Sequence, residues 1–184
     1  MTGTQILVAG IGNIFLSDDG FGPEVLRRMG GRSLPAGVRA VDYGIRGMHL
    51  AYDLLGSAER AAPQALIIVD AVPDRGCPGA LRAFDVAAPD LEGGAFDPHG
   101  MDPGSVLVSL GALGGELPRT VVVGCQVFSV EDGIGLSPNV ISVVDDAVDL
   151  VLDTVELLIT ESQMGPSPRT ETFSARASTA DVRG

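Results

Sequence analysis

The sequence predicts an α/β fold of three layers: a twisted, largely parallel sheet of about five strands with helices on both faces. Nearly continuous aliphatic runs alternate along the chain with helical patterns, and the connections between them are short. Strands covered on both faces of a sheet show such unbroken apolar runs. At 184 residues the chain suits one domain with a sizeable core.

The expected strands are rich in Val, Ile, Leu and Ala, and they span Thr4–Gly10, Gly37–Gly44, Gln64–Val72, Gly79–Val86 and Arg119–Val127. Helical patterns cover 22–30, 47–56, 102–113 and 137–159. In the first of these, Pro23 lies in the opening turn, where proline is tolerated, and Gly30 follows the last turn. Ser137 is the expected N-cap of the long last helix.

The helical periodicity stops near residue 160, which sets the expected domain boundary. Residues 1–160 form the folded domain, and residues 161–184, rich in Ser, Thr, Pro and Arg, are expected to be a disordered tail. The N-terminal residues lack the pattern of a signal peptide, and no apolar run approaches the roughly 20 residues of a membrane span. A soluble, cytoplasmic monomer is therefore expected.

Charge and cysteine content exclude several classes of protein. The net charge of −12 argues against a nucleic-acid or anionic-membrane surface, since both need clustered Lys and Arg. The two cysteines, Cys77 and Cys125, form no C-x-x-C pair, so neither a disulfide framework nor a zinc knuckle is expected. Cys125 is interpreted as a buried core residue and Cys77 as a loop residue.

Several polar residues lie where parallel strands of such a sheet place ligands, beyond their carboxyl ends. Asp18 and Asp19 follow the first strand, Asp42 and Asp70 close the second and third, and His99 lies in a loop before a helix. Singly, each has an ordinary explanation, because aspartates before helices are usually caps and loop histidines usually face solvent.

Two carboxylates and one imidazole at one edge would form a three-ligand set with open positions. Such a set suits a divalent transition ion and leaves zinc, nickel, cobalt and manganese open. The sequence has no H-E-x-x-H helix and no G-x-S-x-G elbow, which disfavours zincins and serine hydrolases.

The glycine-rich stretch after the first strand, "GIGNIFLSDDGFG", raises the alternative of a nucleotide-binding enzyme of Rossmann type. Its fingerprint requires a third glycine where Phe15 stands. A pyrophosphate at the following helix would also face Asp18 and Asp19, whose charges repel it. The stretch therefore favours a cation over a phosphate.

In order, "GIGNIFLSDDGFG", "DYGIRG", "IIVDAV", "PHGM" and "VVGCQ" resemble the motifs of the hydrogenase maturation endopeptidases over roughly residues 6–159. The resemblance implies a peptidase that removes the C-terminal extension from the large-subunit precursor of a nickel–iron hydrogenase. It also implies the three-layer fold described above.

Matched position by position, the nickel-binding residues of that family are Asp19, Asp70 and His99 here. The resemblance implies that the precursor brings the nickel, so that cleavage follows metal loading. The catalytic candidates are Asp19 and Asp70, with Asp18 as an orienting group or base. A nickel-sensing checkpoint or chaperone that binds the precursor without cutting it is an alternative.

The "DYGIRG" segment matches the substrate-recognition motif of the family, commonly D-G-G-T or D-C-G-T. The retained positions are Asp42, Gly44 and Gly47, whose glycines allow a backbone to approach closely. The segment departs from the motif at three positions, and the departures indicate a different class of hydrogenase as client; they are Tyr43, Ile45 and Arg46.

Overall fold

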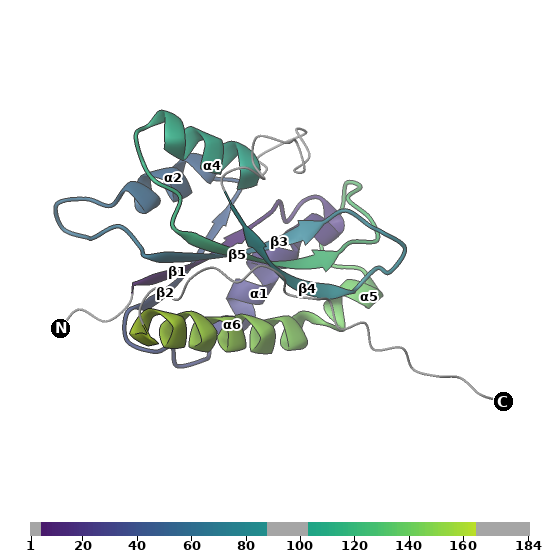
Figure 1. Ribbon diagram of the computed structural model, residues 1–184. Coiled ribbons are helices and arrows are strands. Elements are labelled where there is room, and N and C mark those ends of the chain that lie inside the picture. The colour runs from purple at the N-terminus through teal and green to yellow at the C-terminus, as the bar shows by residue number, and fades with distance from the viewer. Residues whose placement is uncertain (1–4, 88–102, 165–184) are drawn as a thin grey trace.

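The computed structural model describes residues 5–87 and 103–164, which form a five-stranded sheet between two layers of helices (Figure 1). The strand order is β2-β1-β3-β5-β4. The first four strands in this order run parallel, and β4 pairs antiparallel with β5 at the edge. The predicted fold class is confirmed.

The strands fall close to the predicted ranges: β1 Ile6–Ile11, β2 Val38–Gly44, β3 Ala65–Val72, β4 Leu81–Val86 and β5 Arg119–Gln126. Adjacent residues of β1 face opposite sides of the sheet. Ile6 and Val8 belong to the core beneath one helix layer, and Leu7 and Ala9 to the core beneath the other. This is why the strand shows no polar alternation.

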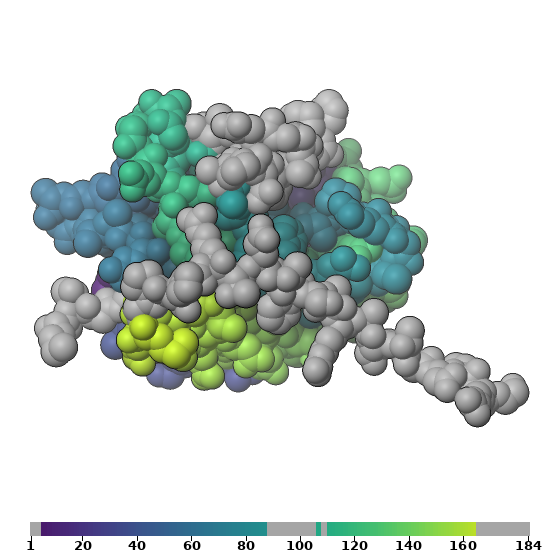
Figure 2. Space-filling model, in the orientation of Figure 1, coloured from purple at the N-terminus to yellow at the C-terminus, as the bar shows by residue number. Residues whose placement is uncertain are grey.

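The helices divide between the two faces. Those described are α1 Phe21–Met29, α2 Gly47–Leu55, α4 Pro103–Ala112, α5 Pro138–Ile141 and α6 Val144–Met164, and the 3-10 turn η1 Ser17–Gly20 precedes α1. Helices α1 and α6 lie on one face of the sheet, and α2 and α4 lie on the other (Figure 1). Their buried side chains belong to two separate core clusters, one on each face. In the space-filling view, yellow-green α6 forms the lower side and green α4 part of the upper side (Figure 2).

The prediction of one continuous helix over 137–159 was wrong, because a turn at 142–143 separates α5 from α6. There the Ser142 hydroxyl donates a hydrogen bond of 2.9 Å to the Asn139 carbonyl, a local bond that competes with helix continuation. Helix α6 then runs to Met164, four residues beyond the expected boundary. The rest of the predicted tail, 165–184, lies outside the described residues.

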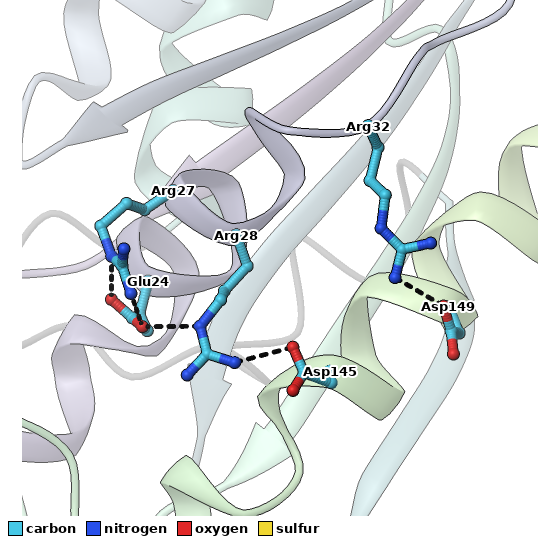
Figure 3. Close-up of polar contacts among 6 residues, drawn as sticks. All are labelled: Glu24, Arg27, Arg28, Arg32, Asp145 and Asp149. Atoms are coloured by element: carbon cyan, nitrogen blue, oxygen red, sulfur yellow. Dashed lines mark hydrogen bonds and ion pairs between the residues drawn. The ribbon is translucent and has the colours of Figure 1, made fainter.

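Ion pairs join α1 to α6 along their exposed sides (Figure 3). Arg28 contacts Glu24 at 3.3 Å within α1 and Asp145 of α6 at 2.7 Å. Just after α1, Arg32 lies 3.6 Å from Asp149. Such exposed pairs contribute at most about 1 kcal/mol each, so they help to align the two helices, while the buried apolar contacts supply most of the packing energy. None of the described helices combines the length and apolar character needed to cross a bilayer.

Candidate functional site

Glycines of the first motif let α1 approach the ends of the central strands. A Cβ atom at Gly22 would overlap the carbonyl oxygens of Ile11 and Val69, and a Cβ at Gly12 would overlap that of Asp19. Gly12 also has a φ of 137°, which favours glycine. Close packing against β1 and β3 thus accounts for these glycines without a bound phosphate.

The structure brings Asp19 and Asp70 to the same edge of the sheet, since η1, which carries Asp19, contacts β3, which carries Asp70. Both side chains are partly exposed. A backbone N–H orients each carboxylate: Asn13 donates to Asp19 Oδ2 at 2.6 Å, and Ala71 donates to Asp70 Oδ1 at 2.8 Å. The pair presents two oriented anionic groups at the carboxyl ends of the strands, where an α/β sheet binds its ligands.

The third predicted ligand, His99, lies outside the described residues. Within residues 5–87 and 103–164, no three His, Cys, Asp or Glu side chains gather closely enough to hold a metal ion. Carboxylate oxygens bind divalent transition ions. An added imidazole ligand raises the preference of the site for such ions over calcium or magnesium. The chemistry of Asp19 and Asp70 therefore fits two positions of the predicted set.

Asp18 differs from its neighbour in burial and in partners. Its side chain is fully buried and accepts hydrogen bonds from four donors, all on the segment after β5. These are the backbone N–H groups of Phe128 at 2.9 Å, Ser129 at 3.1 Å and Ser137 at 2.6 Å, and the Ser137 hydroxyl at 2.8 Å. Burial raises the pKa of the Asp18 carboxyl, but these bonds outweigh burial and hold the pKa below its ordinary value.

Ser137 is an N-cap as predicted, but neither it nor the two aspartates makes a side-chain capping bond. Ser137 does occupy the N-cap position of α5, but its hydroxyl donates to Asp18 and makes no capping bond. Gly20 is the N-cap of α1, so neither Asp18 nor Asp19 caps that helix. For Ser137 and Asp18, a partner far along the chain takes the place of a local capping bond.

Further backbone bonds fasten the β1 loop (residues 12–20) to the β5 loop (residues 127–137). Asp18 N–H donates to the Ser129 carbonyl at 3.0 Å, and Ser17 N–H donates to the Gly133 carbonyl at 2.9 Å. Ser17 has a φ of 50°, a conformation that costs a residue other than glycine about 1 kcal/mol. Nothing in the sequence of the β5 loop signals this contact, which joins residues more than a hundred positions apart.

Cys125 lies buried in β5, close enough to Asp18 to sense its charge. Burial first, and then the negative charge of Asp18, raises the pKa of the Cys125 thiol to about 11. Cys77 is exposed. Both predictions about the cysteines are confirmed, and Cys125 is a core residue next to the site.

The β2 loop (residues 42–47) is held mainly by its own residues. Asp42 is exposed, and its Oδ1 accepts the Gly44 N–H at 2.8 Å. The Arg46 guanidinium donates to the carbonyls of Asp42 at 2.7 Å and Tyr43 at 3.2 Å. Gly44, with a φ of 53°, accepts the Gly12 N–H at 3.1 Å and so joins this loop to the β1 loop.

Two residues of the β2 loop serve the core. A Cβ at Gly47 would lie 2.5 Å from a methyl group of Val106, so this glycine allows α2 to pack against α4. Tyr43 is buried, and its hydroxyl donates to Asp53 at 2.5 Å. Burial, followed by this bond, raises the pKa of Tyr43 above its ordinary value. Of the three departures from the family motif, Tyr43 is thus a packing residue, while Ile45 and Arg46 are exposed.

Comparisons with known proteins agree with this architecture. The sequence profile of the hydrogenase maturation protease family matches residues 23–154. The chain is 34% identical to hydrogenase 2 maturation protease of Escherichia coli over 152 residues, which are 80% of this chain and 88% of that protein. It is 32% identical to coenzyme F420 hydrogenase subunit delta of Methanothermobacter thermautotrophicus over 158 residues, 82% of this chain and 94% of that one.

The fold agrees as well. The structure of the hydrogenase maturating endopeptidase HybD from E. coli superposes with a TM-score of 0.70 at 30% identity, covering 84% of this chain and 94% of that one. A hydrogenase 2 maturation peptidase from a Thaumarchaeota archaeon gives a TM-score of 0.61, also at 30% identity, over 84% of this chain and 99% of that one. The chain therefore belongs to the hydrogenase maturation protease family, and a hydrogenase is the partner that this family implies.

Proposed function

We propose that this chain is an endopeptidase that removes the C-terminal extension from the nickel-loaded large-subunit precursor of a [NiFe] hydrogenase, acting as a cytoplasmic monomer. One observation carries the proposal: a chain of this family places two oriented carboxylates, Asp19 and Asp70, on contacting elements at the ligand-binding edge of its sheet. Carboxylates placed in this way are suited to binding a divalent ion that the precursor carries.

In this proposal the nickel belongs to the substrate. Asp19 and Asp70, together with His99, complete the coordination of the client's ion and thereby dock the bond to be cut. The ion would polarise the scissile carbonyl, and either the ion or a carboxylate beside it would activate the attacking water. Asp18 acts through its neighbours, because its two oxygens already accept four hydrogen bonds from the β5 loop.

The test uses the nickel-loaded and the metal-free precursor with wild-type chain and with an Asp70→Asn variant. Asp153→Asn is the matched control, since Asp153 is an exposed carboxylate on α6. Intact mass spectrometry follows the precursor. We expect the wild type and the control to release a C-terminal peptide only from the nickel-loaded form, and Asp70→Asn to leave the precursor intact. Equal cleavage by Asp70→Asn, or cleavage without nickel, would contradict the proposal.

A checkpoint that binds the precursor without cutting it is the second candidate. It is favoured by the chemistry of the site, because the two oriented carboxylates Asp19 and Asp70 would equally serve a chain that only binds the client's ion. The same experiment separates the two functions. A stable complex with wild-type chain, together with an unchanged precursor mass, would support the checkpoint and exclude the endopeptidase.

A further inference from the structure

Large apolar side chains are exposed on the β1 and β5 loops, which backbone hydrogen bonds join to each other. Their exposed fractions are 50% for Ile14, 61% for Phe15, 68% for Phe128, 54% for Val130 and 82% for Ile134. We call these five residues the apolar rim. Two phenylalanines and three aliphatic side chains in short loops are costly to leave in water, and clustered exposed apolar residues of this kind mark binding surfaces.

The backbone of the apolar rim is fixed before any partner arrives. Gly133 N–H donates to the Phe15 carbonyl at 2.9 Å, and the Ser17 hydroxyl donates to the Glu131 carbonyl at 2.9 Å. Asp18 holds the N–H of Phe128 at the other end of the segment. A surface held in this way binds with little further loss of conformational entropy.

The apolar rim is connected to the candidate site through both the β1 loop and strand β5. Phe15 precedes Asp19 by four residues in the same loop. Phe128 follows the end of β5, the strand whose Gly124 pairs with Asp70 of β3. A macromolecule presenting a bond to the two carboxylates would therefore meet the apolar rim as well.

The charges of the same segment indicate which kind of partner fits. Glu131 and Asp132 are exposed between Val130 and Ile134, so nucleic acid or an anionic lipid surface would be repelled. Aromatic side chains surrounded by polar residues are typical of the centres of protein interfaces. We propose that the apolar rim binds an apolar surface of the hydrogenase precursor beside the segment to be cut; the identity of this partner rests on the proposed function.

The test replaces two aromatic residues of the rim and compares them with a matched pair elsewhere. The rim variant is Phe15→Ser with Phe128→Ser. The control is Phe84→Ser with Leu157→Ser, which changes exposed residues of β4 and α6. Cleavage of the nickel-loaded precursor gives KM and kcat, and the same substitutions in an Asp70→Asn background give the Kd for the uncut precursor.

We expect the rim variant to raise Kd and KM about tenfold or more, as the loss of central aromatic contacts does in other interfaces, and to leave kcat within about twofold. The control should change neither Kd nor the kinetic constants. Because Phe84 is 39% and Leu157 49% exposed, against 61% for Phe15 and 68% for Phe128, the control should lower the Tm at least as much as the rim variant, so a loss of stability alone cannot explain a rise in Kd. A rise in Kd no larger than that of the control overturns the proposal.

Two further outcomes are decisive. Dimerisation of the wild-type chain in light scattering, abolished in the rim variant, would make the rim a contact between copies of this chain and overturn the proposal. If the wild type binds but never cuts, and the rim variant binds at least tenfold more weakly, the docking surface stands while the endopeptidase function fails. Normal cleavage kinetics in the rim variant would support the endopeptidase function and exclude the apolar rim as a docking surface.

Discussion

The β1 and β2 loops lie at the same edge of the sheet but are held by different means. Asp18 fastens the β1 loop to the β5 loop through a fully buried carboxylate with four hydrogen-bond donors. In the β2 loop, the exposed guanidinium of Arg46 donates to two backbone carbonyls, and the Gly44 N–H donates to the Asp42 carboxylate. Buried charge-assisted bonds are stronger and leave unsatisfied groups when broken, whereas exposed ones can be replaced by water.

This difference indicates two mechanical roles. The β1 loop, with the β5 loop bonded to it, forms a rigid platform that carries Asp19 and the apolar rim. Tyr43 and Gly47 anchor the β2 loop in the core, while its exposed residues Asp42, Ile45 and Arg46 are expected to rearrange at smaller cost. Substitutions in the two loops test these roles, and we take them in order of decreasing effect on stability.

Asp18→Asn should have the largest effect on stability. The amide loses the negative charge and turns an N–H₂ group toward backbone donors, so we expect a loss of about 2–3 kcal/mol in the free energy of unfolding. Ser137→Ala removes only the hydroxyl donor and should cost about 1 kcal/mol. Urea unfolding measures both values. Equal losses in the two variants would contradict the conclusion that the Asp18 carboxylate is the main contact between the β1 and β5 loops.

The effect of Asp18→Asn should depend on pH in a known direction. The folded-state pKa of Asp18 lies below the ordinary value of 3.8, so its charged form stabilises the fold above that pH. The stabilisation is lost as the pH falls through the folded-state value. The difference in the free energy of unfolding between wild type and Asp18→Asn should therefore be constant from pH 7 to pH 5 and should decrease below pH 4. The buried Cys125 supplies a second readout, because opening of the β5 loop should speed its alkylation relative to Cys77.

Tyr43→Phe should have an intermediate effect. It removes the hydroxyl that bonds to Asp53 but preserves the buried ring, and Asp53 retains its ion pair with Arg39 at 2.8 Å. We expect a loss of about 1 kcal/mol by urea unfolding. Tyr52→Phe is the control, since Tyr52 is 58% exposed, and it should fall within about 0.5 kcal/mol of wild type. A change in KM without a change in stability would place Tyr43 in client recognition and contradict its role in packing.

Arg46→Ala should have the smallest effect on stability, below about 1 kcal/mol, because its bonds to the two carbonyls are exposed. It should nevertheless raise KM for the precursor about fivefold, equivalent to roughly 1 kcal/mol, since a loop without these bonds loses more conformational entropy when the precursor binds. Arg82→Ala on the exposed side of β4 is the control. An unchanged KM would remove the β2 loop from client binding.

Local patterns predicted the elements well because each pattern reflects a local cause. The aliphatic runs located the strands, since both faces of the sheet are covered, and the placement of Cys125 in such a run correctly predicted its burial. The placement of Asp19 and Asp70 at strand ends followed from the same reasoning. The break between α5 and α6 was missed because the apolar spacing continues through the turn at 142–143, where Ser142 bonds to Asn139.

The chain itself determined the alternation of strands and helices, the three-layer class and the edge at which acidic residues gather, because apolar periodicity and turn residues act over a few positions. The distinction between Asp18 and Asp19 was decided only by tertiary structure. Adjacent and chemically identical, they differ because the donors that bury Asp18 lie 110–119 residues away. No local pattern encodes such a contact, since it exists only when the folded sheet brings the β1 and β5 loops side by side.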